Sequence, residues 1–105
     1  MTDIATIMTA VPSAEEAEQI AEALLVEKLA ACVQIVPIRS RYVWKGEIQR
    51  GNEELLLIKT RMAMFDRVRK RIRALHSYDT PEVIVLPVST ADPDYLAWLL
   101  EMTRP

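Results

Sequence analysis

The feature that most constrains this chain is a long alternation of residue types in its middle third. One side of the alternation carries Ile38, Ser40, Tyr42 and Trp44, and the other carries Arg39, Arg41, Val43 and Lys45. A period of two predicts a β-strand, with a bulge or bend at Gly46. Turn residues at Arg50-Gly51-Asn52 and the run over 53–61 predict a returning strand. The first arm of this β-hairpin would run about 15 residues, where strands usually have 5 or 6.

The chain is too short to cover such a hairpin by itself. Its 105 residues provide a single domain, over 1–105, with one hydrophobic core. The far part of the hairpin, with Tyr42 and Trp44, would then remain in water, unless another subunit covers it. Because a long exposed apolar strand edge promotes aggregation, we favour cover by another subunit over a solvated tip.

The other elements are predicted from periodicity and capping signals. Ser13 and Glu16 form a capping box at the start of the first helix. We expect a strand over 3–10, a helix from there to about Ala30, a helix over 62–76, a strand over 83–88 buried on both faces, and a closing helix that begins at Asp92-Pro93. This order is that of a ferredoxin-like α+β sandwich (βαββαβ) with an additional C-terminal helix.

Composition narrows the classes of function. The net charge of −2 argues against binding nucleic acid by overall attraction. The basic face of the second helix can pair with the glutamates of the first helix. We therefore interpret it as a solvated charged face and not as a nucleic-acid-binding surface. Cys32 is the only cysteine, which excludes an internal disulfide. With no membrane-spanning run and no signal peptide, the sequence predicts a soluble cytoplasmic protein without a membrane or nucleic-acid partner.

The residues that could bind a metal are few. His76 is the only histidine, and it is either a ligand or proton carrier or a residue stabilised at a helix C-terminus. Cys32 is expected to be a small buried apolar residue rather than a nucleophile. A closed zinc site within one chain is hard to assemble from one Cys and one His. The remaining metal hypothesis is a site for copper or another transition metal, built from His76 with Cys32, Met8 or a carboxylate such as Glu82, or with ligands from several subunits.

A second candidate site involves the returning strand and the loop after the second helix. Glu53 and Lys59 share one face of this strand, so Lys59 either projects into a cleft that holds an anionic ligand or reaches solvent at the sheet margin. Tyr78, Asp79 and Glu82 would lie in the loop beside it. The chain contains no Gly-rich phosphate loop, GxSxG, HExxH or CxxC, so we expect no enzyme.

Five segments, read in order, resemble one known family. They are 26–33 (VEKLAACV), 42–46 (YVWKG), Glu53 followed by Lys59-Thr60, 76–82 (HSYDTPE) and 95–98 (YLAW). With this spacing over essentially the whole chain, the sequence resembles the CutA family of divalent-cation tolerance proteins.

The resemblance implies a ferredoxin-like, PII-like subunit that assembles as a tight homotrimer, with the long hairpin packed against its neighbours. It places Glu53, Lys59, Tyr78 and His76 at clefts between subunits. It also implies a sensor or signalling role, and some members bind copper or other divalent ions.

Four positions depart from the pattern that the resemblance implies. Met8 stands where certain copper-binding members have a cysteine, and Leu75-His76 stands where they have two histidines. Of the three ligand positions, only His76 therefore keeps a family ligand, although the thioether of Met8 suits Cu(I). Gln34 and Ser77 replace the family's usual Asn and Pro.

Three hypotheses follow. The leading one is a cytosolic homotrimeric tolerance protein, involved in the response to metal ions, that requires no cofactor and binds copper weakly through His76, with Cys32 and Met8 as further ligands. The second is a PII-like sensor that holds a small anionic metabolite in an intersubunit cleft through Glu53, Lys59, Tyr78 and Glu82. The third is a trimeric scaffold without a ligand, read by an unidentified downstream protein.

Overall fold

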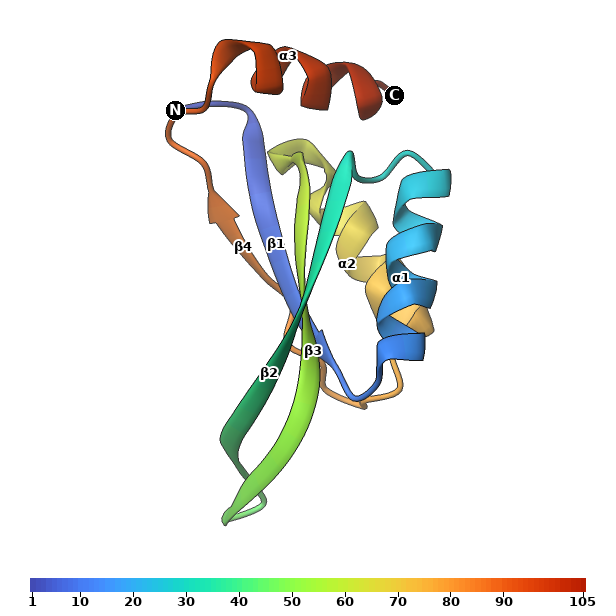
Figure 1. The fold of residues 1–105 in the computed structure, drawn as a ribbon, viewed down its shortest axis with the longest axis vertical. Coiled ribbons are helices and arrows are strands. Elements are labelled where there is room, and N and C mark those ends of the chain that lie inside the picture. The colour runs from blue at the N-terminus through green and yellow to red at the C-terminus, as the bar shows by residue number, and fades with distance from the viewer.

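A four-stranded antiparallel sheet backed by two helices forms the body of the computed structural model, which describes residues 1–105 (Figure 1). The elements in chain order are β1 (Ile4–Val11), α1 (Ala14–Val26), β2 (Cys32–Trp44), β3 (Glu47–Arg61), a 3-10 turn (Met62–Met64), α2 (Phe65–Leu75), β4 (Ile84–Pro87) and α3 (Pro93–Met102). The strands lie in the order β2-β3-β1-β4. The predicted α+β, ferredoxin-like fold with a long hairpin is confirmed.

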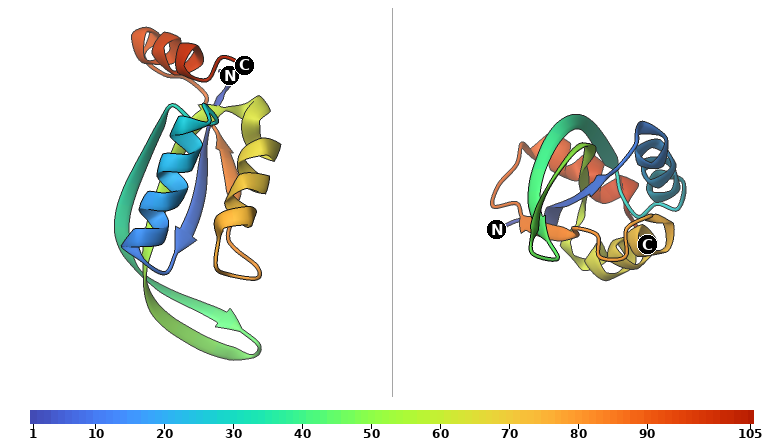
Figure 2. Two further views of the ribbon diagram at one scale, coloured as in Figure 1. Left: turned by 90° about the vertical axis from the view of Figure 1, so that its right-hand side faces the viewer. Right: turned by 90° about the horizontal axis from the view of Figure 1, so that it is seen from below.

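The hydrophobic core lies between the sheet and the helices α1 and α2, which cover the same face (Figure 2). Its fully buried large residues include Ile7, Leu56 and Ile58 from the sheet and Ile20, Leu24, Val68 and Ile72 from the helices. The third helix, α3, lies across one end of the sheet (Figure 1), where the Arg61 guanidinium donates to the carbonyls of Leu100 and Thr103. None of the helices is both long and apolar enough to cross a membrane.

Helix starts follow the predicted capping residues. The Ser13 hydroxyl accepts from the Glu16 amide at 3.2 Å, and the Asp92 carboxylate accepts from the amides of Asp94 and Tyr95. The predicted end of α1 near Ala30 is wrong, since the helix stops at Val26 and Lys28 adopts a left-handed φ of 60° that turns the chain toward β2.

Part of the basic face of α2 is paired with acidic residues of the same chain, as the sequence indicated. Arg71 forms an ion pair with Glu27, the C-cap residue of α1, at 2.9 Å, and Arg69 pairs with Asp66 within α2 at 3.7 Å. The two helices therefore neutralise part of each other's charge.

The hairpin turn differs from the prediction. The turn is Lys45-Gly46, where φ is 52° and 79°, and the predicted turn at Arg50-Gly51-Asn52 is wrong because Gly51 pairs with Ser40 inside the ladder. Two-residue turns with positive φ match the twist of antiparallel strands. Pro37 fits inside β2 because β2 is an edge strand, where one missing N–H is tolerated.

The sheet face opposite α1 and α2 is only partly covered, and we call its apolar part the open face. Paired residues of an antiparallel sheet point to the same side, so the register places on this face Met8, Val36, Leu55, Leu57, Ile84 and Leu86. Ile84 and Leu86 are 45% and 49% exposed. The prediction that this strand is buried on both faces is wrong for the single subunit, because Ile84 and Leu86 point to the face that α1 and α2 do not cover.

Thr9 carries a buried polar group without a partner. The residue is fully buried, and its hydroxyl makes no hydrogen bond. Since an unsatisfied buried hydroxyl costs about 1–3 kcal/mol, Thr9→Val is expected to raise the free energy of unfolding by about 1 kcal/mol in urea denaturation. Thr60→Val is the matched control, because the equally buried Thr60 hydroxyl donates to the Leu29 carbonyl at 2.6 Å. This second change should lower stability, and the same sign for both would contradict the assignment.

Candidate functional site

A cavity of about 860 Å³ lies between the hairpin and the loop that follows α2. Figure 2 shows the hairpin curving beneath this loop. The hairpin contributes Arg39, Ser40, Arg41, Tyr42 and Trp44 from β2 and Glu53 from β3, and the rest of the lining comes from Ala10 and residues 77–82. Five of these lining residues are charged, which makes the cavity polar with an aromatic side.

Glu53 and Tyr78 are joined at the cavity wall. The Tyr78 hydroxyl donates to Glu53 Oε2 at 2.9 Å, which leaves Glu53 Oε1 for another donor. Burial, together with the hydrogen bond to the Glu53 carboxylate, raises the pKa of Tyr78 well above its ordinary value. Tyr78 therefore stays protonated at neutral pH and acts only as a donor to Glu53.

His76 anchors the loop from inside the protein. Its side chain is 0% exposed. Nε2 lies 2.8 Å from the Ala10 carbonyl, and Nδ1 accepts from the Tyr78 amide at 3.1 Å. Because a carbonyl can only accept, these partners assign the proton to Nε2, which donates to Ala10 while the imidazole is neutral. Both ring nitrogens are thus engaged within the protein.

Two further side chains tether the loop. Glu16 Oε2 accepts from the Ser77 amide at 3.0 Å and lies 3.5 Å from His76 Nδ1. The predicted capping-box role of this carboxylate is therefore replaced by a bond to the loop, because no bond to the Ser13 amide forms. Arg73 Nη2 donates to the Asp79 carbonyl at 3.4 Å. With bonds to α1, α2, β1 and β3, this loop forms a defined wall of the cavity.

The predicted cleft residues separate into two places within one subunit. Glu53, Tyr78 and Glu82 line the cavity. Lys59 pairs instead with Cys32 and Thr6 near the α3 end of β3. Six residues of a strand separate it from Glu53, which is about 20 Å. Its predicted role as counter-charge to a ligand beside Tyr78 is not supported by the geometry of a single subunit, and a role across subunits stays a prediction.

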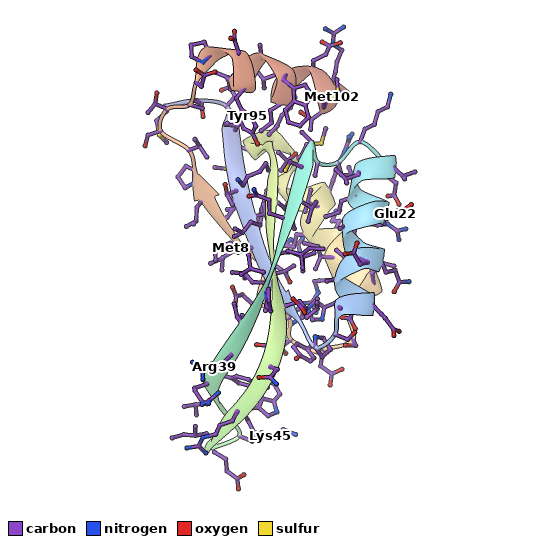
Figure 3. All side chains as sticks on the ribbon, in the orientation of Figure 1. Met8, Glu22, Arg39, Lys45, Tyr95 and Met102 are labelled. Carbon is purple, nitrogen blue, oxygen red and sulfur yellow. The ribbon has the colours of Figure 1, made fainter.

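The predicted metal ligands do not fit a copper centre within one subunit. Both His76 nitrogens are engaged by Ala10 and Tyr78. Met8 lies on the open face in the middle of the sheet (Figure 3). Cys32 lies on the same face nearer to α3, beside Tyr95. No group of three or more His, Cys, Asp or Glu residues is placed to hold a metal ion. With both imidazole nitrogens engaged, and with the two sulfur residues on strands that β3 separates, the three residues do not form one copper site.

The sequence interpretation missed the β2 residues of the cavity lining as part of a site. Arg39 and Arg41 appeared only as one side of an alternation, and Tyr42 and Trp44 as residues that another subunit would cover. Their place near the loop depends on the curvature of the hairpin. Tyr95 was also missed: burial first, and then the neighbouring Cys32 thiol, raise the pKa of its hydroxyl. Nothing in the local sequence marks either arrangement.

Tyr78 gives a testable dependence on alkaline pH. In the unfolded chain a tyrosine ionises near pH 10, and the folded protein raises the pKa of Tyr78 above that value. The protonated phenol's contribution to stability is therefore complete below about pH 10 and is lost as the pH rises above it. Tyr78→Phe should flatten this alkaline limb in denaturation from pH 8 to 11. Tyr42→Phe is the control, and an unchanged limb in Tyr78→Phe would contradict the assignment.

Comparison with known proteins gives one consistent family. The family model described as CutA1 divalent ion tolerance protein matches residues 5–102. A divalent-cation tolerance protein CutA from Thermus thermophilus is 46% identical over 92% of this chain and 95% of its own length. A chloroplastic protein CutA from Arabidopsis thaliana is 44% identical over 93% of this chain, which spans 54% of that relative. The solved structure of a CutA from Archaeoglobus fulgidus, 40% identical, has a TM-score of 0.95, with 96% of this chain and 99% of that chain covered.

The same relatives correct the expected location. The Archaeoglobus fulgidus protein is described as periplasmic, and the Arabidopsis thaliana protein as chloroplastic. The cytoplasmic prediction rested on the absence of recognisable targeting signals. These relatives contradict it, because proteins of this family also occur in other compartments.

Proposed function

This chain belongs to the CutA1 divalent ion tolerance protein family, and from this premise we propose that it acts as a non-catalytic homotrimer in the response to divalent metal ions. The observation that carries the proposal is the partly covered sheet. The open face and the hairpin expose large apolar side chains that the subunit's own three helices leave in contact with water.

Exposure of individual side chains supports assembly. Val36, Ile84 and Leu86 on the open face are 40–49% exposed, and Tyr42 and Trp44 on the hairpin are 45% and 44% exposed. A protein that stays monomeric rarely exposes a large contiguous apolar surface. Burial of such side chains in a neighbouring copy would contribute about 25 cal/mol per Å² of apolar area.

The sheet edges support a ring rather than a two-fold dimer. The two free edges belong to different strands, β2 and β4, so their unpaired backbone groups can meet head to tail in successive copies. Contacts between two different surfaces of identical chains generate closed rings when the rotation closes. A ring of three copies is the assembly that the resemblance to the CutA family implies.

The proposal is tested by placing a charge on the open face. Leu86→Lys should dissociate the assembly into single chains in size-exclusion chromatography, because an ammonium cannot be buried between apolar faces without a partner. Val26→Lys is the matched control, since Val26 is 73% exposed on α1, away from the open face. Dissociation by both changes, or by neither, would contradict assembly through the open face.

Copper bound by His76 is left out of this proposal because the predicted ligands do not fit one ion. The His76 imidazole would have to release the Ala10 carbonyl or the Tyr78 amide before it could bind a metal. Each release would leave a buried polar group without a partner, at a cost of about 1–3 kcal/mol.

The second candidate function is that of a sensor that binds a small ligand. The cavity between the hairpin and the loop favours a sensor over a scaffold without a ligand. Charged residues line this cavity, and the loop that forms one of its walls is held by several hydrogen bonds. Arg39 and Arg41 are also lining residues, on the side of the hairpin away from Glu53. Thermal shift with small-molecule probes would distinguish a sensor from a scaffold.

A further inference from the structure

The two sides of the hairpin differ in charge. In the ladder between β2 and β3, Arg41 stands directly opposite Arg50, and Arg39 is two residues from Arg41 in β2. Because alternate residues of a strand and opposite residues of a ladder point to the same side, the three arginines share one side of the hairpin. We call this side the arginine face. Tyr42 and Trp44 point to the other side, and all three arginines are exposed.

The arginine face carries no counter-charge of its own. No ion pair of the chain includes any of its three arginines. Between positions 39 and 52 the only acidic residue is Glu47, which pairs with Trp44 and therefore points to the other side. Asp79 and Glu82 line the cavity beside the hairpin, but neither forms an ion pair. The face therefore presents three guanidinium groups to the solvent.

This arrangement costs stability as long as no partner is bound. Like charges that stand directly opposite each other in a sheet are destabilising, and Arg41 and Arg50 are such a pair. Arg41 Nη1 donates to the Ser40 carbonyl at 2.9 Å, which leaves the other donors of this guanidinium free. An anion bound between the two guanidinium groups would replace their repulsion with two attractions.

We propose that the arginine face binds a free ligand that carries linked phosphate groups. Guanidinium groups bind phosphate through parallel N–H donors. One exposed ion pair contributes little, whereas a chain of linked phosphates engages several arginines at once. The inference goes beyond the proposed assembly and does not depend on it, since the neighbouring copy is expected to cover Trp44 on the other side of the hairpin.

A free ligand fits this face better than an anionic membrane does. Val43 and Ile48 continue the arginine face toward the tip and are 72% and 63% exposed, and apolar residues beside basic ones also suit a lipid surface. The net charge of −2, however, gives the chain no overall attraction to an extended anionic surface. A small ligand responds instead to the charges within a Debye length of about 8 Å. Figure 3 shows Arg39 and Lys45 on the part of the hairpin that extends beyond the body of the subunit.

Isothermal titration with inorganic tripolyphosphate tests the proposal, with orthophosphate and citrate for comparison. Tripolyphosphate should bind saturably and about tenfold tighter than either comparison anion, which corresponds to about 1.4 kcal/mol. Equal binding of citrate would overturn the choice of phosphate. Sedimentation of the protein with phosphatidylserine vesicles, without any binding of tripolyphosphate, would overturn the proposal in favour of a membrane surface.

Variants place the binding on the arginine face. Arg41→Gln and Arg50→Gln should each weaken tripolyphosphate binding about tenfold. Lys70→Gln is the matched control, because Lys70 is an exposed cation on α2 that forms no ion pair. An equal loss in the control would show attraction to the protein's charge in general and would contradict the site.

The urea midpoint gives a second result that does not depend on titration. Without ligand, Arg50→Gln should raise the midpoint, because the change ends the repulsion across the ladder. Tripolyphosphate should then raise the midpoint of the unchanged protein more than that of the variant. A lower midpoint for the ligand-free variant would contradict the assigned repulsion.

Light scattering on the same samples separates this proposal from the proposed assembly. A trimer that binds no tripolyphosphate would overturn the phosphate site and leave the assembly standing. A single chain that binds tripolyphosphate would overturn the assembly and leave the phosphate site standing.

Discussion

Trp44→Ala loosens the assembly before it unfolds the subunit: this is the expected result with the largest effect on oligomeric state. Trp44 is 44% exposed in the single subunit, on a hairpin that the core between the sheet and the helices does not reach. Complete burial of a large apolar side chain contributes about 1.5–3 kcal/mol, so each subunit should lose about 2 kcal/mol of assembly free energy. Dilution series in analytical ultracentrifugation would show dissociation at higher concentration than for the unchanged protein.

Val43→Ala is the control for this experiment. Val43 is the neighbour of Trp44 in β2 and is 72% exposed, but it points to the other side of the hairpin. Removing its side chain should leave the assembly unchanged. If Trp44→Ala also left the mass unchanged at every concentration, the hairpin would not lie at the interface.

His76→Ala is expected to cause the largest loss of stability among changes at the candidate site. The change removes a buried imidazole together with its bonds to the Ala10 carbonyl and the Tyr78 amide. A buried group left without a partner costs about 1–3 kcal/mol, and the lost packing adds to this. The free energy of unfolding should therefore fall by about 2–4 kcal/mol, as measured by urea denaturation at equal protein concentration.

Copper titration of the same variant distinguishes a structural role of His76 from a metal-binding role. A calorimetric Cu(II) titration should give the same result for the unchanged protein and for His76→Ala, because the imidazole is occupied within the fold. His76→Gln is the partial rescue, since its amide can replace one of the two bonds. Saturable copper binding that His76→Ala abolishes, with little loss of stability, would show that the imidazole is a ligand instead of an anchor.

Predictions from local signals agree best with the structure. The caps at Ser13 and Asp92 depend on residues two or three positions away, and both side chains cap their helices, although Glu16 does not reach back to Ser13. The hairpin turn was misplaced because glycines at positions 46 and 51 both lie among turn residues. Cross-strand register decides between them, and of the two only Gly46 adopts a positive φ.

The candidate site depends on contacts that local patterns do not encode. Glu53 and Tyr78 are 25 residues apart and meet because β3 passes beside the loop after α2. Their membership of one cleft was implied by the family resemblance. The separation of Lys59 from that cleft follows from strand length, because one strand carries Glu53 and Lys59 to different ends of the sheet. The sequence indicated only a capping role for Glu16, so its hydrogen bond from the Ser77 amide of the loop was not predicted.

The mass of the unchanged protein in solution tests the central claim most directly. Multi-angle light scattering should give about 36 kDa, three times the 12.0 kDa of one chain, and this mass should persist on dilution to low micromolar concentration. A mass of one chain at all concentrations would contradict the account, because the open face and the hairpin would then stay in water.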